Sequence, residues 1–359
     1  MTDNLKIFRS ALPLTWKSAS WLLKLMIPIS LAVTLLKHFG VIAWMASYLN
    51  PVFQYLGLPG SSAVIFISGA AAGTYAGLAA MASIQLTLRQ ATILGIMMAL
   101  CHALPMECSV NKKTGSSFWL MAVIRIVMAF VSAICLNMLL PEMNTPYLYI
   151  GAEDDSSLVE VLSTWCFSQV KMAAMVVVII YSLMVVQQFI EAYNLLPKIS
   201  RFLSPLMRAF GLPVQSAYMW LVGNVLGISY GSAVMVDLEE RGLITRDEAR
   251  EVNYHLIMNH SLLEDTIVFA LTGISALWLV GTRMFFAFVL VWGRKGLKRM
   301  IAGVEYLKLL KGANIWFSNP IDAAKHINYI WDNPISWWNS QNIQNIRQQF
   351  CKNYAFFHA

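Results

Sequence analysis

The chain has 359 residues, of which 58% are apolar and only 13% are charged, and its mean hydropathy is +0.59. Soluble domains average about 45–50% apolar and about 25% charged residues, so this composition excludes most soluble classes and predicts an integral membrane protein. The net charge of +7 is modest, and basic residues lie beside apolar blocks, so nucleic acid is not an expected partner. Five cysteines without a C-x-x-C spacing predict no disulfide framework.

Apolar stretches of about 20 residues, the length that a helix needs to cross the hydrocarbon core, recur along the chain. Four are clear: 18–38, 118–140, 168–190 and 267–292. Two more, 61–83 and 215–236, have the length but are rich in Gly, Ser and Ala, which permits close helix packing. The first stretch is not followed by a small-residue cleavage site, so we expect it to remain as a span. The sequence predicts an all-α, polytopic bundle of transmembrane helices.

Lys and Arg are distributed unevenly among the connections. The segments 1–17 and 191–212 and the segment after 292 are basic, whereas 141–167 has five acidic residues and no Lys or Arg. Basic connections stay on the cytoplasmic side, so we expect a bacterial inner-membrane protein with both termini in the cytoplasm and an external acidic loop at 141–167. The polar, Trp-rich segment 296–359 is expected to be a cytoplasmic or interfacial tail.

The sequence contains an internal repeat. Gly57-Leu58-Pro59 recurs as Gly211-Leu212-Pro213, and the same offset of 154 maps Gly69, Gly73 and Gly77 onto Gly223, Gly227 and Gly231. Farther along, an offset of 158 maps His102 onto His260, Glu107 onto Asp265 and Arg125 onto Arg283. A duplicated unit with an odd number of crossings inserts its copies in opposite senses. We therefore expect two inverted repeats, 18–140 and 168–295, preceded by the cytoplasmic N-terminus 1–17.

Each predicted repeat is interrupted by a polar segment, 90–107 in the first and 248–265 in the second. Polar backbone at membrane depth persists only where it is buried in protein or lines a wet cavity. We expect both segments to be re-entrant or broken helices that meet where the repeats join. Pro105 is predicted to break the first of them just before Glu107.

Polar side chains in and near these segments are the candidate substrate-binding residues. On a helix His260 and Glu264 would share a face, a spacing that could hold a cation or hydrogen-bond a polar solute. The predicted set is Asn259, His260, Glu264, Asp265, His102, Glu107, Asn224 and Ser229. The alternative is that these groups only satisfy one another and the broken backbone. The polar residues among the ladder glycines are second-rank candidates to line a cavity, and each could instead bond the carbonyl four residues earlier. They are Ser68, Thr74, Tyr75, Asn224, Ser229 and Tyr230.

Two arginines lie at equivalent positions inside apolar spans, where a charge costs at least ~2.5–3.5 kcal/mol. We expect Arg125 and Arg283 to form structural charge pairs with carboxylates of the interrupted segments, and binding of an anionic substrate is the alternative. The glycine ladders read G-x-x-x-G-x-x-x-G and are predicted to serve helix packing. Their members are Gly69, Gly73, Gly77, Gly223, Gly227 and Gly231.

No catalytic motif is present: the sequence lacks G-x-S-x-G, H-E-x-x-H, a Walker loop and a Cys/His cluster with zinc spacing. We therefore expect no enzyme activity, no cofactor and no metal centre.

The duplicated unit, with G-L-P before a glycine-laddered helix and the run 259–266 reading NHSLLEDT, resembles the Gate, or nucleoside-recognition, domain proteins. The resemblance covers about 20–295. That group takes in spore maturation proteins A and B, and the domain recurs in ferrous-iron permeases of the FeoB type and in concentrative nucleoside transporters. The resemblance implies a gate for a solute, with nucleosides as the substrates that give the family its name.

Together these observations predict a transporter or gate in the lipid bilayer that passes a small polar solute, for example a nucleoside, by alternating access coupled to an ion gradient. The alternative is a non-transporting scaffold or partner subunit of an envelope or sporulation-type assembly. Either protein could form a homo-oligomer or a hetero-oligomer in the membrane.

Overall fold

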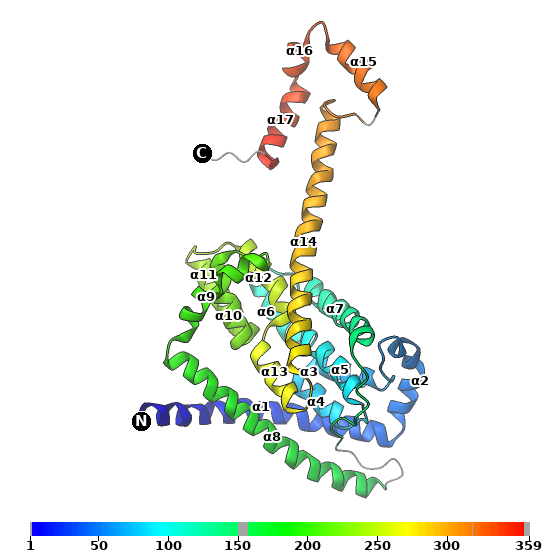
Figure 1. Ribbon diagram of the computed structural model, residues 1–359, viewed down its shortest axis with the longest axis vertical. Coiled ribbons are helices and arrows are strands. Elements are labelled where there is room, and N and C mark those ends of the chain that lie inside the picture. Colours follow the sequence, from blue (N-terminus) through cyan, green and yellow to red (C-terminus); the bar gives the residue numbers. More distant parts are fainter. Residues whose placement is uncertain (1, 150–156, 318, 355–359) are drawn as a thin grey trace. The chain divides into compact units, whose positions relative to one another are not determined.

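A computed structural model describes residues 2–149, 157–317 and 319–354. The chain is 81% helical, and no strand occurs in these three ranges, which confirms the predicted all-α class. It forms two compact units, Met1–Val291 and Trp292–Ala359 (Figure 1). The repeat boundaries 18–140 and 168–295 stay predictions.

The first unit begins with seven helices. They are α1 (Thr2–His38), α2 (Val41–Gln54), α3 (Ser62–Ala72), α4 (Thr74–Ala82), α5 (Leu88–Leu100), α6 (Leu104–Lys113) and α7 (Phe118–Leu139). The chain continues with α8 (Leu158–Ala192), α9 (Leu195–Ala209), the short 3-10 turn η1 (Val214–Ser216), α10 (Ala217–Val225), α11 (Ile228–Glu240), α12 (Arg246–Asn259), α13 (Leu262–Leu271) and α14 (Ala276–Gly312).

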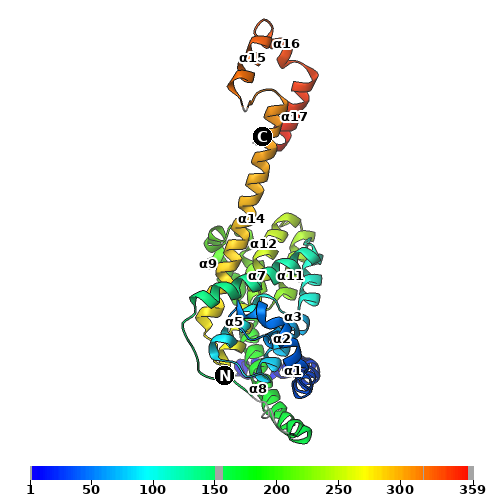
Figure 2. The ribbon, with the colours of Figure 1, turned by 90° about the vertical axis from the view of Figure 1, so that its right-hand side faces the viewer.

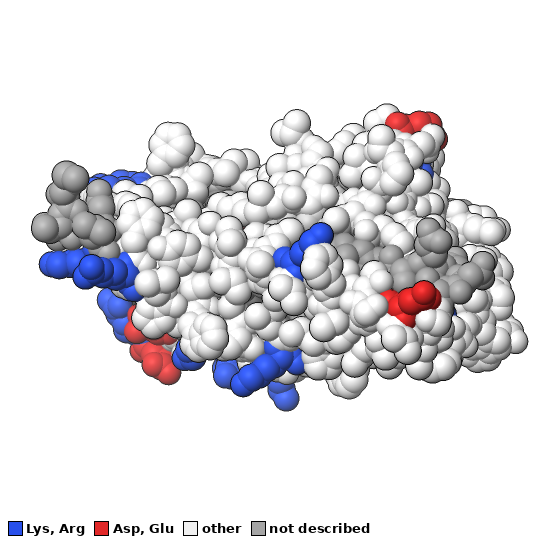
Figure 3. All heavy atoms as spheres, turned by 90° about the horizontal axis from the view of Figure 1, so that it is seen from below, with Lys and Arg blue, Asp and Glu red and all other residues white. Residues whose placement is uncertain are grey.

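Five described helical segments are long and apolar enough to cross a membrane: Lys6–His38, Leu88–Lys113, Phe118–Leu139, Leu158–Ala192 and Ala276–Ile301. In Leu88–Lys113, 72% of the apolar window is buried, against 25–39% in the other four, so this segment lies at the centre and the others offer apolar surface to lipid. Seen from below, the surface is mostly uncharged, with Lys and Arg gathered mainly toward one end (Figure 3). The chain is a membrane protein.

The long helices α1 and α8 lie side by side in opposite directions (Figures 1 and 2). Ser10 near the start of α1 bonds Gln188 near the end of α8, while Ser30 accepts hydrogen bonds from Trp165 and Gln169. The fully buried Ser30 hydroxyl and the half-buried side chains of Trp165 and Gln169 thus find partners within an otherwise apolar contact, which supports close helix packing in lipid.

The glycine-laddered stretches are not continuous spans, which corrects the prediction for 61–83 and 215–236. The first breaks at Gly73, between α3 and α4, and the second breaks at Gly227, between α10 and α11. Both glycines have φ near +100° with ψ near 170° (106°/174° and 91°/168°), a backbone conformation essentially restricted to glycine. Their role is to permit the break, which replaces the packing role predicted for them.

The other ladder glycines lie where backbones approach closely. A Cβ on Gly77 would come within 2.2 Å of the Met98 sulfur, and one on Gly69 within 2.9 Å of the same atom. A Cβ on Gly231 would lie 2.9 Å from the Cα of Gly223. A side chain at Gly231 would force two backbones apart, whereas one at Gly69 or Gly77 would first displace the Met98 side chain.

The two polar segments are broken helices. The first breaks between α5 and α6 at Cys101–Ala103, and the second between α12 and α13 at His260–Ser261. Ala103 and Ser261 both have left-handed backbone, with φ of 44° and 52°. Each is tied to the neighbouring ladder helix, because the Ala103 N–H donates to the Gly69 carbonyl at 3.1 Å and the Ser261 N–H to that of Gly223 at 3.0 Å.

Two predictions about these breaks are wrong. Pro105 does not break the helix, because it lies in the first turn of α6, where a missing N–H costs no helical hydrogen bond. The predicted span 267–292 is also divided: α13 ends at Leu271 and α14 begins at Ala276.

The second unit contains the rest of α14 and the helices α15 (Pro320–Ile330), α16 (Pro334–Trp338) and α17 (Gln341–Tyr354). The side chains of Asn319 and Asn333 accept hydrogen bonds from the first-turn N–H groups of Ile321 and Ser336, both at 3.0 Å. The two Asn-Pro pairs thus begin helices α15 and α16, in agreement with the preference for Asn at the cap and Pro at the first position.

Candidate functional site

The four helix breaks line one cavity of about 240 Å³. Its walls include Gly73, Ala103, Gly227 and Ser261, the residues that immediately precede α4, α6, α11 and α13. The N-terminus of each of these helices therefore lies at the cavity. A helix N-terminus carries a partial positive charge and N–H groups without helical partners, so the cavity offers favourable sites for carboxylates or for the polar atoms of a solute.

Three carboxylates occupy these N-termini. Glu107 lies in the first turn of α6, and Glu264 and Asp265 lie in the first turn of α13. All three line the cavity, together with the imidazole of His102. The charges are thus concentrated where the backbone is broken, and the fold places them there from both halves of the chain.

Each buried arginine supports the break in its own half. The Nη1 atom of Arg125 lies 2.5 Å from Glu107 Oε2, and its Nε donates to the Leu100 carbonyl at 2.9 Å. In the second half, the Nη1 atom of Arg283 lies 2.9 Å from Asp265 Oδ2.

Arg283 also bonds the carbonyls of Met258, at 3.0 Å, and of His260. The Leu100 carbonyl lies at the end of α5, and the Met258 and His260 carbonyls lie at the end of α12, where helical hydrogen-bond partners are missing. The structure therefore pairs each arginine with a carboxylate and with a carbonyl at a helix end, the arrangement expected of structural charge pairs.

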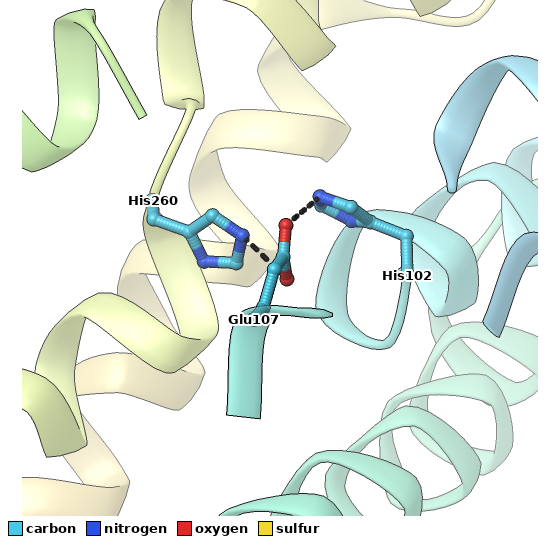
Figure 4. Close-up of side chains that lie close together, drawn as sticks. All are labelled: His102, Glu107 and His260. Atoms are coloured by element: carbon cyan, nitrogen blue, oxygen red, sulfur yellow. Dashed lines mark ion pairs between the residues drawn. The ribbon is translucent and has the colours of Figure 1, made fainter. Parts of the chain in front are cut away.

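Two histidines meet one carboxylate across the join between the halves. His102 Nε2 lies 3.2 Å from Glu107 Oε1, and His260 Nε2 lies 3.0 Å from Glu107 Oε2. Figure 4 shows the two rings on opposite sides of the Glu107 carboxylate. All three residues are at most 5% exposed, and the ring centroids lie 5.0 Å apart. The cluster combines one histidine from each half with a carboxylate from the first.

The other two carboxylates take hydroxyl partners from α4. Thr74 donates to Asp265 at 3.1 Å, and the Tyr75 hydroxyl donates to Glu264 at 3.1 Å. The prediction that His260 and Glu264 share a helix face is wrong, because the chain breaks between them. Glu264 turns to Tyr75, whereas His260 caps the end of α12 and faces Glu107.

The remaining predicted residues lie in different places. Ser229 lines the cavity at the start of α11. Asn259 is fully buried and contacts His255 and the Met284 sulfur, and it is not among the residues that line the cavity. Asn224 is also buried, and its amide donates to the Trp220 carbonyl in its own helix. The structure thus does not bring Asn259 and Asn224 to the cavity with the others.

Sequence reasoning ranked Thr74 and Tyr75 second although they contact the carboxylates directly. Their position immediately after Gly73 was the available signal, since a glycine break exposes the first turn of the following helix. The meeting of His102, Glu107 and His260 was also missed as a unit, because its members are far apart along the chain.

A second cavity, of about 600 Å³, lies beside the first. Both cavities are lined by Leu226 and Tyr230, and the larger one is also lined by Tyr218, Asp237 and Arg241. The side chains of Leu226 and Tyr230 therefore stand between a larger compartment and the carboxylate-lined one.

Comparison with known proteins gives the family. The family profile described as nucleoside recognition, named Gate, matches residues 19–117. The uncharacterized membrane protein YvoD of Bacillus subtilis (strain 168) is 30% identical over 278 residues, which cover 75% of this chain and 88% of that protein. The chain belongs to the nucleoside-recognition (Gate) family. The family match lies within the first half of this Gate protein, so the second half of the site rests on the structure.

Two further comparisons concern the C-terminal segment and the solved structures. The profile of the LIC12162 family transferase matches residues 288–358 of the Gate protein, which comprise the end of α14 and helices α15 to α17. No solved structure matches the chain.

Proposed function

We propose that this Gate protein passes a small polar solute across the membrane by alternating access, driven by an ion gradient and without catalysis of its own. The observation that carries the proposal is the cavity at which four broken helices from both halves meet, lined by Glu107, Glu264, Asp265 and His102. Discontinuous helices whose ends point at a central site are the usual substrate-binding arrangement of secondary transporters.

The size of the cavity bears on the solute. Sites for drug-sized ligands occupy about 300–1,000 Å³, and the cavity of about 240 Å³ lies below that range. It suits an ion or a small solute as it stands. A nucleoside would need the space to widen toward the neighbouring cavity of about 600 Å³, past Leu226 and Tyr230. Movement of these two side chains is the gating step in the proposal.

The proposed membrane arrangement has two halves inserted in opposite senses in the inner membrane, with both termini in the cytoplasm. The recurrence of equivalent contacts supports the duplication, since Arg125 and Arg283 bond equivalent carbonyls and carboxylates. The lack of Lys and Arg in 141–167 supports the external location of that loop.

Cysteine labelling tests this arrangement. In a background from which the five native cysteines have been removed, Asn144→Cys should react with an impermeant maleimide from outside intact spheroplasts. Met300→Cys should react only after the membrane is opened. Labelling of both positions from the same side would refute the inverted arrangement.

Uptake into proteoliposomes tests transport itself. We expect a labelled nucleoside or a divalent metal ion to accumulate when a proton or sodium gradient is imposed, and Glu264→Gln to reduce uptake at least tenfold. Glu142→Gln removes the same charge from an exposed loop position and should leave uptake unchanged. If neither solute class enters with any gradient, while the protein is folded in the vesicles, the transport proposal fails.

The second candidate is a non-transporting membrane scaffold or partner subunit. The observation that favours it is that Arg125 and Arg283 each neutralise a carboxylate of their own half, so much of the buried charge is already balanced. In that case Glu264→Gln would leave the folded protein and its assembly with membrane partners unchanged, and no solute would move.

A further inference from the structure

The backbone sets the protonation pattern of the two buried histidines. The Nδ1 atom of His102 lies 3.0 Å from the Met98 carbonyl oxygen, and that of His260 lies 2.8 Å from the Leu256 carbonyl oxygen. A carbonyl oxygen only accepts hydrogen bonds, so Nδ1 must carry the hydrogen in both rings. In the neutral ring, Nε2 then has a free lone pair.

Both Nε2 atoms lie close to oxygen atoms of Glu107, and an ionised carboxylate only accepts hydrogen bonds. His102 Nε2 and His260 Nε2 lie 3.2 and 3.0 Å from the two oxygens of Glu107. The His260 Nε2 atom is completely buried and makes no hydrogen bond of acceptable geometry. Two electron-rich contacts of this kind repel unless a positive charge lies between the atoms. Protonating both rings would supply it, but two cationic rings with centroids 5.0 Å apart would repel each other.

We infer that His102, Glu107 and His260 form a binding site for one divalent first-row transition metal ion, of the Zn²⁺ or Mn²⁺ kind. One ligand atom from each of the three residues lies within 4.8 Å of the other two. Ligands at about 2.0–2.1 Å from a tetrahedral ion are about 3.3 Å apart, close to the two observed nitrogen–oxygen distances. A single ion would relieve both repulsive contacts at once.

The surroundings have the features of a metal site. The Nδ1–H bonds to the Met98 and Leu256 carbonyls fix the orientation of the two imidazole rings, and Arg125 fixes the Glu107 carboxylate. Metal ligands in proteins usually make outer contacts of this kind. Imidazole and carboxylate together suit Zn²⁺, Fe²⁺ and Mn²⁺ more than Ca²⁺ or Mg²⁺, which prefer oxygen ligands alone.

With one ligand atom from each of the three residues, a tetrahedral ion would keep a fourth coordination position. His102 and Glu107 both line the cavity of about 240 Å³, so water or a solute can reach the ion from there. The Asp265 Oδ2 atom lies 4.0 Å from His102 Nε2 and is the nearest further ligand. Three carboxylates against two guanidinium groups around the cavity also favour a bound cation.

Metal binding to the purified full-length protein tests this inference. The protein, prepared in detergent without a polyhistidine tag and stripped with chelator, should retain one Zn²⁺ per chain after desalting. X-ray absorption of the zinc-loaded wild type should show two imidazole ligands. His102→Gln and His260→Gln should each weaken binding by more than about 100-fold, the upper effect of losing an outer contact.

A control variant distinguishes loss of the metal site from the loss of any buried histidine. His255→Gln changes another buried histidine, on α12, that contacts Trp220 and Asn259 and should leave Zn²⁺ binding unchanged. Circular dichroism checks that each variant is folded. The inference is overturned if the folded wild type retains no stoichiometric metal, if binding survives both site variants, or if X-ray absorption finds fewer than two imidazoles. X-ray absorption of the wild type tests the inference even if the variants unfold.

The inference goes beyond the proposed function, because a scaffold could hold the same ion. Stoichiometric zinc without uptake of any solute would keep the metal site and refute transport. Uptake of a solute by a protein that binds no metal would support transport and refute the metal site.

Discussion

Equivalent positions in the two halves of the site share their backbone contacts but differ in their side chains. Ala103 and Ser261 have the same left-handed backbone and bond equivalent glycine carbonyls, and Arg125 and Arg283 bond equivalent carbonyls as well as carboxylates. The carboxylates differ: Glu107 in the first half corresponds to Asp265 in the second. Glu107 is longer by one methylene and contacts both histidines, whereas Asp265 is held by Arg283 and Thr74.

The residues that begin the broken helices differ as well. Thr74 and Tyr75 donate to the carboxylates of the second half, but the equivalent positions in the second half are Ile228 and Ser229. Ile228 has no hydroxyl, so Glu107 receives no donor equivalent to Thr74 and remains available to the histidines. The comparison teaches that the repeated backbone builds the breaks, while the side chains that differ give the two carboxylates different partners.

The largest expected effect is the loss of a buried arginine. Arg283→Leu leaves the Asp265 carboxylate buried without its charge partner and should destabilise the protein by about 3–5 kcal/mol. Arg125→Leu should cost a similar amount in the metal-free protein, because the neutral histidines offer Glu107 no positive charge. Thermal unfolding in detergent measures both. The double variant Arg283→Leu with Asp265→Leu should recover much of the loss, and an equal loss in the double variant would contradict the pairing argument.

The next effect concerns the helix breaks. Gly73→Ala and Gly227→Ala place a side chain on backbone that alanine avoids, and each should destabilise the protein by about 1–3 kcal/mol. Gly227→Ala should be the worse of the two, since its Cβ would lie 3.1 Å from Ser261 Oγ, whereas a Cβ at Gly73 has open space to 3.8 Å. Thermal unfolding again gives the measurement. Gly281→Ala, in a helix and with nothing within 4 Å, is the control and should not destabilise.

The difference between the carboxylates can be tested by shortening Glu107. Glu107→Asp keeps the charge but withdraws the oxygens from the two histidines, so zinc affinity should fall about tenfold or more, or ~1.4 kcal/mol. Asp265→Glu, the reverse exchange in the second half, should change zinc affinity much less. Equilibrium titration with Zn²⁺ measures both affinities. Equal losses in the two variants would show that the halves contribute alike.

The smallest expected effect is the loss of one hydroxyl. Tyr75→Phe removes the hydrogen bond to Glu264 without changing the ring, and should destabilise the protein by about 0.5–1.5 kcal/mol. Tyr48→Phe removes a hydroxyl from a side chain that is 69% exposed and should have no effect. If thermal unfolding gave the two variants the same stability, the hydrogen bond from Tyr75 to Glu264 would make no net contribution to the free energy of unfolding.

Much of the fold could be predicted from patterns that are local in the sequence. The apolar stretch 118–140 nearly coincides with α7, and the stretches 18–38 and 168–190 lie within the longer helices α1 and α8. Burial in lipid requires such uninterrupted runs of apolar residues. The polar segments 90–107 and 248–265 predicted broken helices, which the structure confirms as α5–α6 and α12–α13.

The positions of the breaks were harder to predict. Ser261 has left-handed backbone although it is not a glycine, so its sequence gives no sign that α12 ends there. The assignment of His260 and Glu264 to one helix face failed for that reason. The ladder glycines also have two different roles, since Gly69 and Gly73 look alike in sequence but only Gly73 lies at a helix break.

The amino-acid sequence by itself determined that the chain is a helical membrane protein of the Gate type, because hydropathy, the G-L-P repeats and the polar interruptions are all properties of neighbouring residues. Only the tertiary structure decided which polar groups meet. Thr74 and Asp265 are 191 residues apart, and His260 reaches Glu107 in the other half of the chain. Such pairs depend on how helices pack in three dimensions, which no pattern of neighbouring residues encodes.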